Sequence, residues 1–350
     1  MKNWSRNFLV LLFLIASSAR AQELSDKEVL KTLTVENARD KAIKKALMFL
    51  ESAKNSDGSS GSHNRPALTG LSIMAFLSAG HTFEDPVYGD SLARSLRTVL
   101  GHQDASGYYG GSDNGRMYGH GIITLMLAES LGMTKSPELE ERIHKSLEKA
   151  VGVTIQAALV PKQLPHAGGW HYQPDSHESD LSLSGWQLMS LHAAEQVGIP
   201  VPGNVISNAV AYAKRLTSRD GKVGYRNRDE DHPALRGLGL LSLAIGNQLD
   251  APEVGAIGEK IQSDPFQWEG RWVFYRAYYD AVGLNRALPK VWEKYGPRME
   301  KIFIDHQNAD GSWEGPPQNN EYTEGGPVYV TSMAVLALTV NRHVLPAYQR

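Results

Sequence analysis

Residues suited to acid chemistry stand together in one charged stretch, RNRDEDHP, residues 226–233. A carboxyl group next to an imidazole can serve as a proton donor, because a neighbouring titratable group changes the pKa of the carboxyl. Asp231 is therefore our candidate catalytic acid, and His232 is its supporting group. The same stretch also has the composition of an ordinary charged loop, and its proline suits the first turn of a following helix.

A second polar stretch, HAGGWHYQPDSHESD, spans residues 166–180 and ends in Asp180, a further candidate for catalysis. Its possible metal ligands are His166, His171, Asp175, His177 and Glu178. No two of these histidines stand four residues apart, the spacing that would place them on one face of a helix. The chain has no cysteine, which excludes thiolate zinc sites and cysteine nucleophiles. We expect neither a metal nor a cofactor.

Candidates for ligand binding carry an aromatic ring or a hydrogen-bonding group and lie close to the start of an apolar segment. They are Tyr118, His120, Trp170, His171, Trp186, Arg271, Trp272, Tyr275 and Tyr322. Such rings form platforms for sugars or walls for apolar ligands, and they also fill hydrophobic cores. Tyr275 and Tyr279 are four residues apart and would share one helix face.

Two kinds of helical segment must position these residues. Charged segments such as residues 138–151 and 296–307 have apolar positions three and four residues apart, which predicts half-exposed outer helices. Apolar segments rich in small residues alternate with them and predict buried helices. The apolar segments are residues 67–80, 119–132, 181–198, 233–246, 276–285 and 329–340. Four of them end in a glycine suited to a left-handed helix cap: Gly80, Gly132, Gly198 and Gly246.

Glycine-centred turns separate the outer from the inner segments at intervals of roughly 40 to 60 residues, the range of helical-hairpin repeats. They are centred on Gly58, Gly107, Gly169, Gly221, Gly270 and Gly311. No stretch alternates with the period of a strand. The sequence therefore predicts an all-α protein, a single (α/α)6 toroid whose inner helices surround a central cavity. Because these helices would run in one direction, their N-termini would encircle one mouth, which favours polar or negative ligand groups.

Two turns share a further pattern, in which a glutamine is followed by a glycine four residues on and an aromatic residue two later. Gln307, Gly311 and Trp313 form one copy, and a copy with tyrosine starts at Gln103. A third copy, from Gln163 to Trp170, has one extra residue. The glutamine can bond backbone groups left free at the end of the outer helix, and the ring packs between repeats.

These turns match the QW motif, and the chain resembles the terpene cyclase and protein prenyltransferase superfamily over roughly residues 38–340. Residues 168–191 look more narrowly like secreted bacterial prenyltransferase and squalene oxidase repeat proteins. Squalene cyclases protonate an alkene with an aspartic acid in a D-x-D-D motif. Residues 229–232 match three of its four positions and carry histidine at the last. Cyclases of this type are usually about twice as long, with a second helical barrel. The zinc ligands of the prenyltransferases include a cysteine, which this chain lacks.

The first residues have the pattern of a cleaved signal peptide. Lys2 and Arg6 precede an apolar run too short to span a bilayer, and an A-x-A site ends at Ala21. We therefore expect a leader at residues 1–21, a linker at 22–37, the toroid domain at 38–345, and a secreted or periplasmic location. Lys+Arg (36) and Asp+Glu (38) nearly balance, so we expect no nucleic-acid partner, and no later segment is apolar enough to span a membrane.

The function expected from these features is binding of a hydrophobic or glycan ligand, or of a protein partner, in or at the central cavity, without cyclase or prenyltransferase activity. The alternative is an enzyme. In a cyclase-like enzyme, Asp231 would be the acid, with Asp180, His120 and Tyr275 facing it across the cavity. In a carbohydrate-active hydrolase or lyase, Asp180 and Asp231 would supply acid and base.

Overall fold

The computed structural model describes residues 37–111, 115–342 and 344–345. The chain divides into two compact units, residues 1–41 and residues 42–350. In the first unit, the side chain of Asn37 accepts a hydrogen bond from the backbone N–H of Asp40 at the start of a helix. The expected leader, and all of the expected linker except its last residue, lie outside the described residues.

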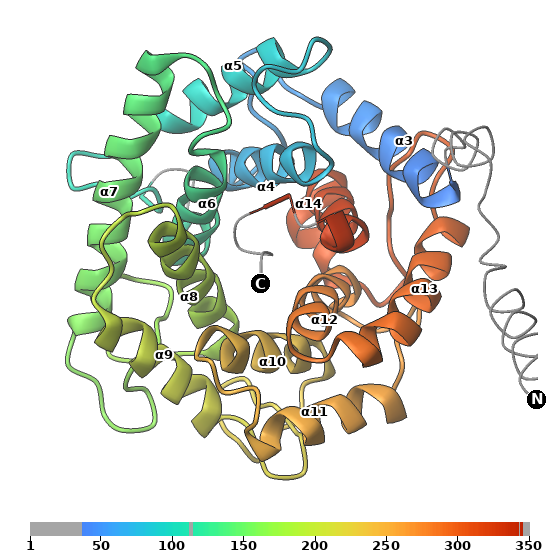
Figure 1. The fold of residues 1–350 in the computed structure, drawn as a ribbon. Helices are drawn as coiled ribbons and strands as arrows, with labels where there is room; N and C mark the ends of the chain where they lie inside the picture. Colours follow the sequence, from blue (N-terminus) through green and yellow to red (C-terminus); the bar gives the residue numbers. More distant parts are fainter. Residues whose placement is uncertain (1–36, 112–114, 343, 346–350) are drawn as a thin grey trace, which may run out of the picture. The chain divides into compact units, whose positions relative to one another are not determined.

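The second unit contains two concentric sets of helices (Figure 1). The inner set is α4 (Arg65–Ser78), α6 (Arg116–Ser130), α8 (Leu181–Gln196), α10 (Arg236–Ile245), α12 (Val273–Ala287) and α14 (Asn320–Thr339). The outer set is α3 (Ala38–Ser52), α5 (Gly89–Leu100), α7 (Pro137–Leu159), α9 (Gly203–Arg215), α11 (Pro252–Ser263) and α13 (Pro289–Asp305). Short 3-10 helices at Pro233–Leu235 and Val340–Arg342 adjoin α10 and α14.

Each inner helix packs against the next along the chain, and α14 packs against α4, which closes the ring. The described residues contain isolated β-bridges but no strand. The predicted all-α class and toroid architecture are confirmed, and each apolar segment of the sequence overlaps an inner helix. No helix in the described ranges is both long and apolar enough to cross a membrane.

Small residues allow the inner helices to approach closely. In α4, every residue from Pro66 to Ser78 is buried. A methyl group on Gly237 of α10 would lie 2.2 Å from the backbone of Tyr279 in α12, and one on Gly283 would lie 2.1 Å from the carbonyl oxygen of Gly237. Helices α10 and α12 therefore touch through their backbones, which no larger side chain at these positions would permit.

The turns between outer and inner helices dock on the following outer helix. Gly311 has a φ of 93° and its Cα faces the backbone of Lys45 in α3, so that a Cβ there would lie 2.3 Å from the Lys45 carbonyl oxygen. Gln307 donates from Nε2 to the carbonyl oxygens of Gly311 and Ala42. The ring of Trp313 is buried and donates from Nε1 to the carbonyl oxygen of Phe303.

Gln103 makes the equivalent bonds to the carbonyl oxygens of Gly107 and of Ser146, which lies in the middle of α7. We predicted that these glutamines bond free backbone groups at the end of their own outer helix. Each instead bonds the carbonyl oxygen of the turn glycine and a carbonyl oxygen of the neighbouring outer helix. In the third turn, the glycine with positive φ is Gly168 rather than Gly169.

Two helix ends also differ from the sequence prediction. Gly80, Gly132 and Gly198 have positive φ, but the inner helix α10 is followed by Gly246 at φ −78° and Asn247 at φ 52°. Asparagine tolerates the left-handed conformation better than most residues, so it replaces glycine there. Helix α14 begins at Asn320, well before the predicted segment, and has a non-helical residue at Gly326, next to Pro327.

Candidate functional site

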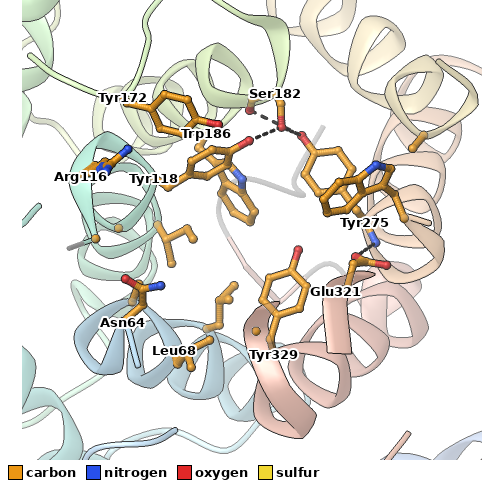
Figure 2. Close-up of a pocket in the computed structure, with 18 of the residues that line it drawn as sticks. Asn64, Leu68, Arg116, Tyr118, Tyr172, Ser182, Trp186, Tyr275, Glu321 and Tyr329 are labelled. Atoms are coloured by element: carbon orange, nitrogen blue, oxygen red, sulfur yellow. Dashed lines mark hydrogen bonds between the residues drawn. The ribbon is translucent and has the colours of Figure 1, made fainter. Parts of the chain in front are cut away.

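A cavity of about 700 Å³ lies at the N-terminal ends of the inner helices. It is lined by residues of α4, α6, α8, α12 and α14 and of the loops that lead into them (Figure 2). Its aromatic lining residues are Tyr118, Tyr172, Trp186, Tyr225, Trp272, Tyr275 and Tyr329. Of the ligand-binding and catalytic candidates, it brings together Tyr118, Trp186, His232, Trp272 and Tyr275.

One side of the cavity is aliphatic. Ala67, Leu68 and Leu71 of α4 and Ile122 of α6 line it, and Gly119 between them adds no side chain. Figure 2 shows Leu68 on α4 and Tyr329 on α14 on the side of the cavity opposite Ser182. This wall presents no charged side chain, so it suits apolar groups.

The facing side carries a cluster of three hydroxyl groups from three inner helices. The Ser182 hydroxyl of α8 lies 2.5 Å from the Tyr118 hydroxyl of α6 and 2.7 Å from the Tyr275 hydroxyl of α12. We call these three residues the hydroxyl triad. Burial raises the pKa of both tyrosines, and the nearby charge of Asp180 raises it further. The triad is therefore neutral at physiological pH.

Glu321 of α14 also lines the cavity, but its carboxylate is engaged in capping a helix. One oxygen accepts from the backbone N–H of Phe274 at 2.9 Å and the other from that of Tyr275 at 2.8 Å. Both donors belong to the first turn of α12, whose dipole favours a negative charge at this place. Glu321 thus holds Tyr275 in position, a structural role that occupies both of its oxygens.

Asp180 lies behind the triad and does not line the cavity. It is fully buried and caps α8, accepting from the backbone N–H of Leu183 at 2.8 Å. Its second oxygen is 3.6 Å from Nε2 of His171. Burial raises the pKa of Asp180 to about 6, although its bond to Leu183 opposes the rise. The sequence prediction had Asp180 facing the cavity, whereas its side chain is buried at the start of α8 and does not line it.

Asp231 does not line the cavity and is held in an ion pair. Its two oxygens accept from Nε and the terminal nitrogen of Arg236 at 3.3 and 2.8 Å, and Arg236 also binds Asp264 at 2.7 Å. His232 does line the cavity, but its Nε2 lies 3.2 Å from Glu230 rather than on Asp231. The expected acid and its supporting histidine are thus not paired, because the guanidinium of Arg236 is the better partner for the aspartate.

Two further candidates, His120 and Trp170, are buried in the wall and do not face the cavity. Nε2 of His120 lies 3.1 Å from the Ala150 carbonyl oxygen and from the Thr154 hydroxyl, and Nδ1 accepts from the Tyr109 N–H. Burial lowers the pKa of His120 to about 4, so the ring is neutral. Trp170 donates from Nε1 to the carbonyl oxygen of Thr154. Both side chains join an inner helix or turn to α7.

The other candidates lie around the cavity rather than in it. Arg271 is exposed and its carbonyl oxygen accepts from Asn320, while Tyr322 is half-buried against the core. His171 packs edge-on against Tyr172, which does line the cavity. In the third turn, His166 and His177 bond to backbone groups of residues 179 and 161. Within the described ranges, no group of three or more histidine, aspartate or glutamate side chains is placed to hold a metal.

Sequence reasoning missed Ser182, Glu321 and Tyr225 as lining residues. Ser182 and Glu321 each stand within the first two residues of an inner helix, so their position was a usable signal. Tyr225 carried no such signal in the sequence, because it lies in a loop well before its inner helix. Its carbonyl oxygen accepts a hydrogen bond from the Leu181 N–H of a different hairpin, a contact that only the folded chain makes.

The sequence matches no family model and no curated protein. Solved structures do match its fold. The type II terpene cyclase MstE from Scytonema, in a complex with merosterolic acid A, is 13% identical with a TM-score of 0.57, over 88% of this chain and 97% of that one. An α-1,6-mannanase from Salegentibacter, an inactive variant in complex with α-1,6-mannotriose, is 12% identical with a TM-score of 0.61, over 87% and 100%.

The chain has an α/α toroid fold. MstE in complex with geranylgeranyl dihydroxybenzoate matches it equally well, with a TM-score of 0.57 and 14% identity over 88% of this chain and 98% of that one. Two toroids of different chemistry, a terpene cyclase and a glycan hydrolase, thus match this toroid to a similar degree. At these identities the likeness concerns the fold, and the function has to be argued from the cavity of this toroid itself.

Proposed function

We propose that this toroid binds an apolar, isoprenoid-like ligand in its central cavity and does so without chemistry on that ligand. The observation that carries the proposal is the lining of the cavity, in which the aliphatic wall of Leu68, Leu71 and Ile122 faces aromatic rings. Burying apolar surface is the main source of affinity for such a ligand. The volume, about 700 Å³, falls within the range of small-molecule sites.

The placement of the carboxyl groups supports binding over acid catalysis. Protonating an alkene requires a strong acid in contact with the ligand. Asp231 is committed to Arg236, and Asp180 is buried behind the triad with its pKa raised to about 6, which makes it a weaker acid than an ordinary aspartate. Neither geometry suits a cyclase.

A glycan is the second candidate ligand, and the tyrosine hydroxyls and the half-exposed Trp272 at the cavity favour it. The mannanase neighbour was made inactive by replacing two consecutive aspartates, and this chain contains no two consecutive aspartates. Among the described lining residues, Glu321 is the one carboxylate, and both of its oxygens are occupied. A paired-carboxylate hydrolase is therefore the weaker proposal.

The location proposed for this function is the periplasm or the outside of the cell. It rests on the leader pattern of residues 1–21 in the sequence. Mass measurement of the N-terminal peptide of protein recovered from the envelope fraction tests it, because cleavage after Ala21 leaves Gln22 as the first residue.

Native mass spectrometry tests the ligand class. Protein from the envelope fraction is measured intact and after denaturation, and then after incubation with farnesol or with mannotriose. We expect a complex with farnesol and none with mannotriose. A Trp272→Ala variant, which removes a partly exposed ring from the cavity, should retain less farnesol, whereas Leu164→Ala on the exposed surface should bind normally. A complex with mannotriose alone would replace the apolar ligand by a glycan.

A further inference from the structure

The two sides of the cavity differ in polarity, and the difference constrains the ligand further. The side chains of Ala67, Leu68, Leu71 and Ile122 offer no hydrogen bond, and the polar groups beside them are those of Asn64 and Tyr329, whereas the opposite side presents the three linked hydroxyl groups of the triad (Figure 2). A ligand that is apolar throughout would offer the triad no hydrogen-bonding group. Buried hydroxyl groups lose free energy when they lack partners.

We propose that the ligand is an isoprenoid-like alcohol, whose single uncharged hydroxyl group binds the triad of Tyr118, Ser182 and Tyr275 while its chain lies against α4 and α6. The inference rests on the proposed function, because it assigns the orientation and head group of the same ligand. Figure 2 shows the triad on one side of the cavity and Leu68 on the other, so a ligand can contact both at once.

The proton count of the triad explains why a hydroxyl group fits. Three hydroxyl groups hold three protons, and the two short contacts inside the triad use two of them. In a chain that donates from Tyr118 through Ser182, the hydroxyl of Tyr275 keeps its proton, and its other neighbours are the Ser182 carbonyl oxygen at 3.5 Å and the Tyr279 hydroxyl. In the reverse chain, Tyr118 keeps its proton. Either way the triad has one donor and a free lone pair to offer, which an alcohol complements with one acceptor and one donor.

The charges around the triad favour a neutral head group. Asp180 stands two residues before Ser182, and its negative charge raises the pKa of both tyrosines. A carboxylate or diphosphate placed on the triad would meet this charge in a poorly hydrated site. The guanidinium of Arg116 lies over the ring of Tyr172, 5.5 Å from its centre. Glu321 and His232 are the other titratable groups on the lining, and Glu321 is bound to the start of α12.

The test is a competition between farnesol and its hydrocarbon analogue that lacks the oxygen, followed by native mass spectrometry of the protein. We expect farnesol to be retained about five- to tenfold better, the effect of one or two hydrogen bonds. Tyr118→Phe with Tyr275→Phe should abolish this preference while the hydrocarbon binds as before. Ser182→Ala, which leaves both tyrosine hydroxyls without their shared partner, should retain the preference for the alcohol. Tyr212→Phe is the matched control, since it removes a buried tyrosine hydroxyl that does not line the cavity.

The outcomes separate the two proposals. Retention of neither compound would overturn both the proposed function and this inference. Equal retention of alcohol and hydrocarbon would leave apolar binding in place and overturn the role of the triad. Tighter binding of farnesyl diphosphate than of farnesol would overturn the neutral head group and point to Arg116. Melting temperatures of all variants are recorded, and should Ser182→Ala not fold, the two phenylalanine substitutions decide the question.

Discussion

Two aspartates that precede inner helices have opposite surroundings in this toroid. Asp180, before α8, is fully buried, caps its helix and lies 3.6 Å from His171. Asp231, before α10, keeps a quarter of its side chain exposed and shares the guanidinium of Arg236 with Asp264. Burial disfavours the charge on Asp180 and raises its pKa, whereas Asp231 is held in an ion pair near the surface. The same residue type before two inner helices thus caps a buried helix start in one hairpin and binds an arginine in another.

This contrast shows that position in the repeat does not decide chemistry. Arg236 is the first residue of α10, and it extends toward Asp264 after α11, so the loop of Asp231 is held between two hairpins. Near Asp180, the neighbouring cation is Arg226, which is bound to Glu178 instead. The two carboxyl groups thus differ in burial and in their local partner, and three predictions break or sharpen this comparison.

The largest effect is expected for Arg236→Ala. Its side chain is only 5% exposed and joins two carboxylates, so its loss leaves Asp231 without its cation, whereas Asp264 keeps Arg276 at 3.4 Å. We expect the free energy of unfolding to fall by about 3 kcal/mol, the lower end for a broken buried ion pair because the carboxylates can reach water. Urea denaturation measures it. Arg226→Ala, which removes an exposed pair with Glu178, should cost less than about 1 kcal/mol.

An effect of about 2–3 kcal/mol that depends on pH is expected for Asp180→Asn. The folded-state pKa of Asp180, about 6, is above its ordinary value of 3.8, so the folded protein binds this proton more tightly than the unfolded chain. Its contribution to stability is complete below pH 4 and is lost as the pH rises through 6. Asparagine keeps a carbonyl oxygen for the Leu183 N–H and cannot ionise.

The measurement is urea denaturation of the wild type and of Asp180→Asn at about pH 4.5 and pH 7.5. The variant should gain stability relative to the wild type as the pH rises. A difference that is the same at both pH values would show that Asp180 is ionised throughout and would remove the contrast with Asp231.

The smallest effect is expected for Asp231→Asn at neutral pH. The side chain is 25% exposed, and Arg236 keeps Asp264 as a second partner. We expect a loss of about 1 kcal/mol, and unchanged farnesol binding because Asp231 does not line the cavity. Loss of binding with retained stability would restore Asp231 as a site residue.

Most of the fold was predictable because each repeat has a recognisable local pattern of apolar, charged and glycine residues. Apolar segments without a polar face, charged segments with one, and glycine turns between them identify inner and outer helices, as the positive φ of Gly107 and Gly311 illustrates. The beginning of α14 was not predictable in this way. Its first residues are polar, and the helical conformation there is supported by Asn319 at its cap and by bonds from α12 to Glu321.

The candidate site was predicted in part. Tyr118, Trp186, Trp272 and Tyr275 line the cavity as expected, because aromatic residues at the start of inner helices face the ring centre. His120 and Trp170 stand at similar places in the sequence, but their side chains are buried in the wall. There a ring nitrogen of each forms a hydrogen bond with a carbonyl oxygen of α7. Sequence spacing predicts which helix carries a residue and how far along that helix it lies. It does not predict whether the side chain faces the cavity or a hydrogen-bonding partner in the wall.

The amino-acid sequence by itself determined the class of fold, the number and order of helical hairpins and the aromatic character of the region before each inner helix, since these depend on local periodicity and composition. Only the tertiary structure decided which groups meet. The hydroxyl triad comes from α6, α8 and α12, and the ion pairs of Arg236 join α10 to residues on both of its flanks. Closure of the ring brings these groups together, and the burial it creates sets their charge.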